Sequence, residues 1–148
     1  VVDSGITVGG GEISAGARKL LAVTEEALAH GIKAAVPGAR IGDISAAIEK
    51  FVKARGFSVV EDLCGHGVGY AVHEEPTIPN FGKAGTGPLI EVGHVYAIEP
   101  IVNAGKKEVY FDDVGDGYSV YTKDGSISAH FEHTVAITAK GPLILTRF

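Results

Sequence analysis

The sequence contains no methionine and no tryptophan, and only one cysteine. A single cysteine cannot form an internal disulfide or a thiolate-rich metal site, and it fits a reducing compartment. No apolar run approaches the roughly 20 residues of a transmembrane helix, and the first residues lack the basic and then apolar pattern of a secretory signal. We therefore expect a cytoplasmic location and no membrane partner.

Positive charge is also scarce. Lysine and arginine total 13 against 18 acidic residues, and the formal net charge is -5. This balance leaves no basic footprint for nucleic acid. No charged or low-complexity tract is long enough to indicate disorder. The length of 148 residues suits one domain with a buried core, so we predict a single domain over residues 1–148.

The missing methionine also bears on the start of the chain. A native reading frame begins with methionine, whereas this chain begins VVDSG, which has the pattern of the middle of a strand. We expect the chain to be part of a larger protein and to lack its N-terminal portion. A processed or engineered terminus is the alternative.

Two amphipathic helices are predicted in the first third of the chain. Apolar residues at helical spacing predict the first over residues 14–35, where Pro37 and Gly38 end it. A second apolar face predicts a helix over residues 41–55, with Gly42 or Asp43 as its cap and Gly56 after its end.

The remaining chain has the pattern of strands separated by turns. The turn signals are Asn103-Ala-Gly, Asp116-Gly and Asp124-Gly, and residues 79–87 form a glycine-rich loop. Two helices and a run of hairpin-linked strands indicate an α+β fold, in which the helices cover one face of an antiparallel sheet. The expected strands are residues 1–8, 57–60, 94–99, 108–111, 118–122, 129–138 and 143–146.

Three residues carry the chemistry that the sequence suggests. His66 lies among glycines in CGHGVGYAVHEEP, and glycines there serve backbone conformation or close approach rather than packing. Glu99 in VYAIEPIV and Glu132 in HFEHTVAIT lie in apolar strands, where a carboxylate is costly unless it is paired or bound to metal. Imidazole and carboxylate ligands suit Mn, Fe, Co or Zn. A structural salt bridge is the alternative.

Other kinds of site receive less support. The chain has no G-x-S-x-G elbow and no phosphate-binding loop, and the glycines around His66 precede no βαβ unit. Cys64 could act as a nucleophile with His66, but two residues on one strand line up poorly for that role. We interpret the remaining histidines as structural or exposed, namely His30, His94, His130 and His133.

Three segments together resemble the bacterial type I methionine aminopeptidases: CGHGVGYAVHEEP, YAIEPIVNAGKKE and DGYSVYTKDGSISAHFEHTVAIT. These are dinuclear metallopeptidases of the pita-bread fold, and the resemblance covers essentially the whole chain. It implies removal of N-terminal methionine from proteins and peptides by metal-activated water. X-Pro aminopeptidases and prolidases share the histidines and are an alternative, but they would carry EPGIY and R-x-E-D where this chain has EPIVNAG and FEHT.

The resemblance assigns roles to the metal ligands. His66 resembles the single histidine ligand, and Glu99 resembles a ligand of the same ion that also handles the proton of the attacking water. Glu132 and Asp3 resemble the two carboxylates that bridge both ions. We therefore expect divalent Co, Mn, Fe or Zn, with two ions in the family pattern and one fully liganded by this chain.

The resemblance also assigns substrate contacts and shows a departure. His73 resembles the histidine that contacts the scissile peptide, while Val72 and Tyr118 fall where the family lines its methionine pocket. The family's first aspartate ligand lies upstream of Asp3, beyond this chain, so we expect weak turnover or none from the chain alone. The family is monomeric. The alternatives are a non-catalytic pita-bread module that binds a partner, and a chain that folds as an oligomer or with a complementing fragment.

Overall fold

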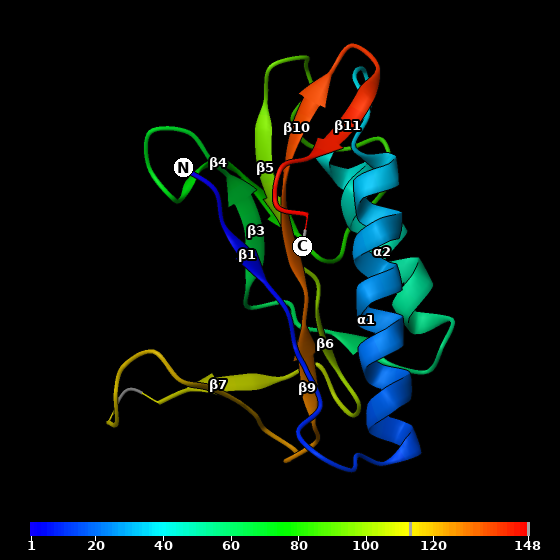
Figure 1. Ribbon diagram of the computed structural model, residues 1–148, viewed down its shortest axis with the longest axis vertical. Coiled ribbons are helices and arrows are strands. Elements are labelled where there is room, and N and C mark those ends of the chain that lie inside the picture. The colour runs from blue at the N-terminus through cyan, green and yellow to red at the C-terminus, as the bar shows by residue number, and fades with distance from the viewer. Residues whose placement is uncertain (113, 148) are drawn as a thin grey trace.

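Two helices lie side by side in the computed structural model, which describes residues 1–112 and 114–147 (Figure 1). Helix α1 spans Ala15–Ala34 and α2 spans Ile41–Lys53, in agreement with the sequence prediction. The Ser14 hydroxyl caps α1 by accepting the Ala17 N–H at 3.1 Å.

The cap of α2 differs from the prediction. Arg40 is the N-cap residue, rather than Gly42 or Asp43. Asp43 acts from inside the first turn, because its Oδ2 accepts the Arg40 N–H at 2.8 Å.

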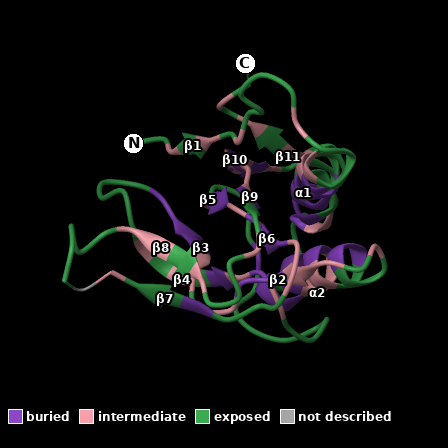
Figure 2. Cartoon of the chain, turned by 90° about the horizontal axis from the view of Figure 1, so that it is seen from below, coloured by how far each residue is buried: buried purple, intermediate pink, exposed green. Residues whose placement is uncertain are grey.

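The strands form three antiparallel sheets. The largest has the order β1-β10-β5-β3-β4 with β11 paired to β10, the second has the order β2-β6-β9, and β7 pairs with β8. The helices lie along one side of these strands in both views, which confirms the α+β expectation (Figures 1 and 2). The strands are β1 (Ser4–Gly5), β2 (Ser58–Val59), β3 (Cys64–Gly67), β4 (Glu74–Pro79), β5 (Val95–Ile98), β6 (Ile101–Asn103), β7 (Val109–Phe111), β8 (Val120–Thr122), β9 (Ser128–His130), β10 (Glu132–Thr138) and β11 (Gly141–Ile144).

The strand predicted over residues 129–138 is wrong in one respect. It is two strands, β9 and β10, which belong to different sheets. Strand β5 ends at Ile98 and β6 begins at Ile101, and Glu99 and Pro100 lie between them. Pro100 has no N–H to donate to a neighbouring strand. Phe131, between β9 and β10, connects to this gap, because its N–H donates to the Pro100 carbonyl at 3.4 Å.

The predicted terminal strands also shift. Only Ser4–Gly5 pairs within the strand expected over residues 1–8. The strand expected over 143–146 starts earlier, as Gly141–Ile144, because it forms a tight hairpin with the end of β10.

The hydrophobic core lies between the helices and the two larger sheets (Figure 2). Gly31 of α1 permits a close approach there, since a Cβ at this position would lie 2.8 Å from Ile48 Cδ1 of α2. In the described part of the chain, no helix combines the length and the apolarity needed to cross a bilayer. The largest buried side chains include Leu20, Ile44, Ile48, Ile78, Ile90, Tyr96, Ile98 and Val135.

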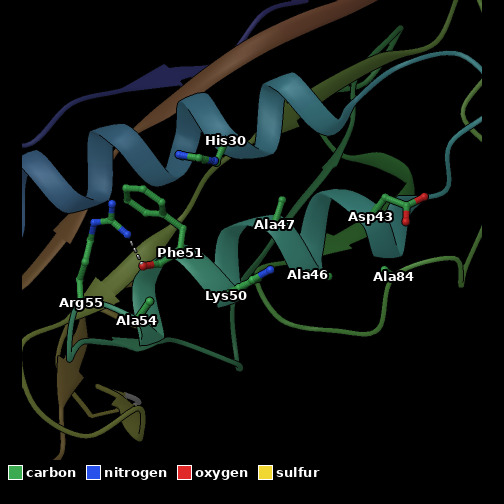
Figure 3. A pocket seen from close by; sticks show the side chains of 9 residues that line it. All are labelled: His30, Asp43, Ala46, Ala47, Lys50, Phe51, Ala54, Arg55 and Ala84. Atoms are coloured by element: carbon green, nitrogen blue, oxygen red, sulfur yellow. Dashed lines mark hydrogen bonds between the residues drawn. The ribbon is translucent and has the colours of Figure 1, made fainter.

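A groove of about 640 Å³ runs along α2 and is also lined by His30 of α1 and by Ala84 (Figure 3). The Phe51 ring forms part of its wall and lies 4.2 Å from the His30 ring centre and 3.4 Å from Arg55 Cζ. None of the residues predicted to bind metal or substrate lines this groove, so the candidate site lies elsewhere.

Candidate metal centre

Strand register places the three predicted chemical residues on one face of the largest sheet. Ala97 of β5 lies opposite His66 of β3 on one side and Thr134 of β10 on the other. Residues opposite each other share a face, and so do alternate residues along a strand. Glu99 and Glu132 are each two residues from this row. All three functional side chains therefore belong on the face of His66.

The other face of the same strands supports the helices. Tyr96 and Ile98 of β5 and Val135 of β10 are buried in the core. The row between the functional residues is made of small side chains, Ala97 and Thr134, which are fully buried. Small residues leave space above the sheet for the longer histidine and glutamate side chains to converge.

The structure brings the three predicted residues together. The ligand atoms of His66, Glu99 and Glu132 all lie within 4.8 Å of one another. His66 Nε2 lies 3.4 Å from Glu99 Oε1, and these side chains are only 7% and 14% exposed. Since metal–ligand bonds are about 2 Å long, this spread suits a shared ion.

Asp3 joins the cluster from a different direction. Its ligand atom groups with those of His66 and His73, again within 4.8 Å of one another. Thr134 fixes the backbone of Asp3, because its Oγ1 accepts the Asp3 N–H at 2.8 Å and donates to the Asp3 carbonyl at 2.7 Å. The four predicted ligands thus form two groups that share His66, rather than one compact group.

The tautomer of His66 favours a cation. Its Nδ1 lies 2.9 Å from the Gly67 carbonyl, which can only accept, so we assign the proton to Nδ1. The lone pair of Nε2 then faces Glu99 Oε1. Two acceptors at this separation repel each other unless a metal ion or a proton lies between them. A metal-ligating histidine commonly donates its other N–H to a carbonyl in this way.

The carboxylates of Asp3, Glu99 and Glu132 concentrate negative charge at a site that is partly shielded from solvent. Burial raises the pKa of Glu132 to about 7, with further contributions from the charges of Glu99 and Asp3. No lysine or arginine in the described part of the chain forms an ion pair with these three acids. A salt bridge to lysine or arginine is therefore not supported, and the donor set fits a divalent ion.

His130, which the sequence analysis interprets as structural or exposed, lies beside the cluster. Its Nε2 lies 3.4 Å from Glu99 Oε2. Burial acts to lower the pKa of His130, but the interaction with Glu99 and the charges of Glu132 and Asp3 outweigh it and raise that pKa. The spacing was an available signal, because His130 precedes Glu132 by two residues and alternate strand residues share a face.

The remaining predicted residues lie around the cluster. The ring centre of His73 is 4.2 Å from that of His66, and the side chain is exposed. Val72 is 41% exposed in the loop after β3, and Tyr118 is 89% exposed between β7 and β8. Their roles in substrate binding stay predictions. Burial raises the pKa of the Cys64 thiol, which disfavours the thiolate that a nucleophile needs.

The other histidines have partners away from the cluster. His94 Nδ1 lies 2.6 Å from the Tyr96 hydroxyl. His133 Nδ1 lies 3.0 Å from Thr146 Oγ1. His30 packs on Phe51 (Figure 3). These contacts agree with the structural interpretation of the three residues.

One imidazole and three carboxylates lie beside an antiparallel sheet that has helices on its other face, and this donor set fits a metalloprotein. The chain belongs to metallopeptidase family M24, whose family model matches residues 1–139. This assignment agrees with the resemblance of the three sequence motifs.

Within this family, the chain is similar to methionine aminopeptidases from several bacteria. The chain is 51% identical over 144 residues to methionine aminopeptidase of Clostridium perfringens, covering 97% of the chain and 57% of that protein. It is 49% identical over 145 residues to methionine aminopeptidase 1 of Bacillus subtilis, covering 98% of the chain and 58% of that protein. The chain therefore spans a little more than half the length of these curated relatives.

The fold has a close counterpart among solved structures. Methionine aminopeptidase from Thermotoga maritima superposes with a TM-score of 0.95 at 44% identity, and the match covers 99% of this chain and 58% of that one. The expected pita-bread architecture is thereby confirmed for the matched part.

Proposed function

We propose that this chain carries the metal-binding and proton-transferring residues of a methionine aminopeptidase, which removes N-terminal methionine from peptides and proteins. The observation that carries the proposal is the convergence of His66, Glu99 and Glu132, whose ligand atoms lie within 4.8 Å of one another and, among the described residues, have no lysine or arginine partner. The names of the most similar relatives support the same activity.

The proposed ligands are Asp3, His66, Glu99 and Glu132. Their mixed imidazole and carboxylate set suits Mn, Fe, Co or Zn. A bound divalent ion supplies a water molecule whose pKa is lowered toward about 7 and polarises the substrate carbonyl. Reducing surroundings in the cytoplasm suit a chain with Cys64 as its one thiol.

The side chains divide the remaining work. Glu99 has one oxygen on the His66 side and one on the His130 side. As a carboxylate next to the proposed metal position, it can accept a proton from water and pass it to the leaving amine. His73 is exposed beside His66 and can donate a hydrogen bond to the carbonyl oxygen as charge develops there. Val72 and Tyr118 offer exposed apolar surface for an unbranched thioether side chain.

Metal titration tests the ligand set. Metal-free protein titrated with Mn²⁺ by calorimetry should bind close to one equivalent tightly. His66→Ala should abolish the tight site. His30→Ala is the matched control, because that histidine packs on Phe51 outside the cluster. Equal binding by His66→Ala and the parent would contradict the assignment.

Peptide hydrolysis tests the reaction. We expect release of methionine from Met-Ala-Ser by the Mn²⁺-loaded chain to be weak. It should fall further by at least about 100-fold in Glu99→Gln, the typical effect of losing a general acid–base group. The control Glu26→Gln removes an exposed carboxylate of α1 and should keep the parent rate. Cleavage of X-Pro peptides in place of methionine release would favour the prolidase branch.

A further inference from the structure

The Glu99 carboxylate lies between two imidazole rings. Its Oε1 is 3.4 Å from His66 Nε2, and its Oε2 is 3.4 Å from His130 Nε2. The two contacts have equal lengths but differ in chemistry. The Gly67 carbonyl holds the proton of His66 on Nδ1, so its Nε2 presents a lone pair. His130 Nε2 can carry a hydrogen and donate it in a hydrogen bond to Glu99 Oε2.

Few hydrogen-bond partners are within reach of His130 Nε2. Nε2 is buried and makes no hydrogen bond of good geometry in the described part of the chain, although the side chain as a whole is 38% exposed. Glu99 Oε2 is the partner within ion-pair distance. A buried N–H without a partner destabilises the folded state. A slight movement of Glu99 that shortens this contact is therefore favourable.

The surrounding structure fixes the ring in this place. Thr7 Oγ1 donates to the His130 carbonyl at 2.8 Å and accepts the His130 N–H at 2.9 Å, which pins the backbone at the end of β9. Gly5 leaves room for the ring, since a Cβ there would lie 3.3 Å from His130 Cε1. Both contacts come from the N-terminal segment that also brings Asp3 to the cluster.

We propose that His130 is a positioning residue for Glu99. Its Nε2–H holds Oε2, so that Oε1 points with His66 Nε2 toward the metal position. The inference rests on the proposed function. His130 is not itself placed as a ligand, because its nitrogens do not join the groups of ligand atoms that lie within 4.8 Å of one another.

Two substitutions separate positioning from mere packing. His130→Ala removes the donor, whereas His130→Gln keeps an amide N–H of similar reach. Co²⁺ affinity, measured by chelator competition on the full chain, should fall about 10- to 100-fold in His130→Ala, as is usual when the hydrogen-bond partner of a ligand is lost. His130→Gln should stay within a few-fold of the parent. Urea unfolding of each variant shows whether it is folded.

The visible absorption of the Co²⁺ complex gives a second readout. Its ligand-field bands should shift in His130→Ala and return toward the parent position in His130→Gln, because they depend on the placement of Glu99. A merely structural role would leave the bands of the folded protein unchanged. Equal affinity and equal bands in parent and His130→Ala, with His66→Ala unable to bind, would overturn this inference alone.

Proton NMR of the Co²⁺ complex distinguishes positioning from ligation. One exchangeable ring N–H with a large paramagnetic shift is expected, from Nδ1 of His66. Two such signals, with one lost in His130→Ala, would show that His130 binds the ion directly and would overturn the positioning role. If the parent does not bind Co²⁺ at all, the proposed function fails and this inference fails with it.

Discussion

Glu132→Gln should stabilise the metal-free protein at alkaline pH. The carboxylate is buried near Glu99 and Asp3, and its pKa rises from 4.5 to about 7. Glutamine keeps the shape of the side chain and removes its charge. The substitution therefore tests whether this acid is strained in the absence of an ion.

The sign and size of the effect follow from proton linkage. Because the folded-state pKa of Glu132 lies above the unfolded value, the folded state binds the proton more tightly. That contribution to stability is fully present below pH 4.5 and is lost as the pH rises through about 7. The difference between the two pKa values corresponds to about 3 kcal/mol. Parent and variant should therefore have similar stability near pH 5, and the variant should be more stable by about 2 to 3 kcal/mol near pH 8.

Urea unfolding with a chelator present, at both pH values, measures this difference. Glu26→Gln on the exposed face of α1 is the matched control and should show no comparable pH-dependent gain. Mn²⁺ should reverse the order near pH 8, since it stabilises the parent by binding the folded state. Equal stability of parent and Glu132→Gln near pH 8 without metal would refute the reasoning, because it would mean that water or another group already neutralises the charge.

Two glycines give further expectations. Gly5→Ala should weaken Mn²⁺ binding about tenfold with little change in unfolding, because its Cβ would lie 3.3 Å from His130 Cε1 and 3.4 Å from Glu132 Oε2; unchanged affinity by calorimetry would argue against this crowding. Gly31→Ala should lower the free energy of unfolding by about 1 to 3 kcal/mol, since its Cβ would lie 2.8 Å from the buried Ile48 Cδ1. Gly16→Ala, at an exposed position of α1, should instead stabilise by up to about 1 kcal/mol, and urea unfolding of the two variants should give opposite signs.

Helix prediction succeeded because its signals are local. The apolar spacing around Leu20 and Leu28 and the turn at Pro37 specify α1 within a few residues of chain. The cap of α2 was misplaced because Arg40 is an unusual N-cap and the useful oxygen comes from Asp43, one turn inside. Strand ends were less predictable, because a strand ends where its partner ends, and that partner is distant in sequence.

The break at Phe131 illustrates this dependence. Residues 129–138 have the pattern of one continuous strand, and nothing local interrupts it. The interruption lies beside Pro100 on the neighbouring segment, where the pairing changes from β6 with β9 to β5 with β10. This break lies beside both glutamates of the cluster, so the feature that shapes the site was invisible to local patterns.

The sequence by itself determined which residue types are available for chemistry. His66 among glycines, and Glu99 and Glu132 in apolar strands, were identified because a buried carboxylate conflicts with its surroundings and needs a partner. The tertiary structure alone decided how they meet. The register of β3, β5 and β10 placed the three side chains on one face. The ligand atom of Asp3 groups with those of His66 and His73, and His130 lies next to Glu99. The reason is physical: composition and periodicity act within a few residues, whereas ligand geometry depends on hydrogen-bonded register between strands that are far apart in the chain.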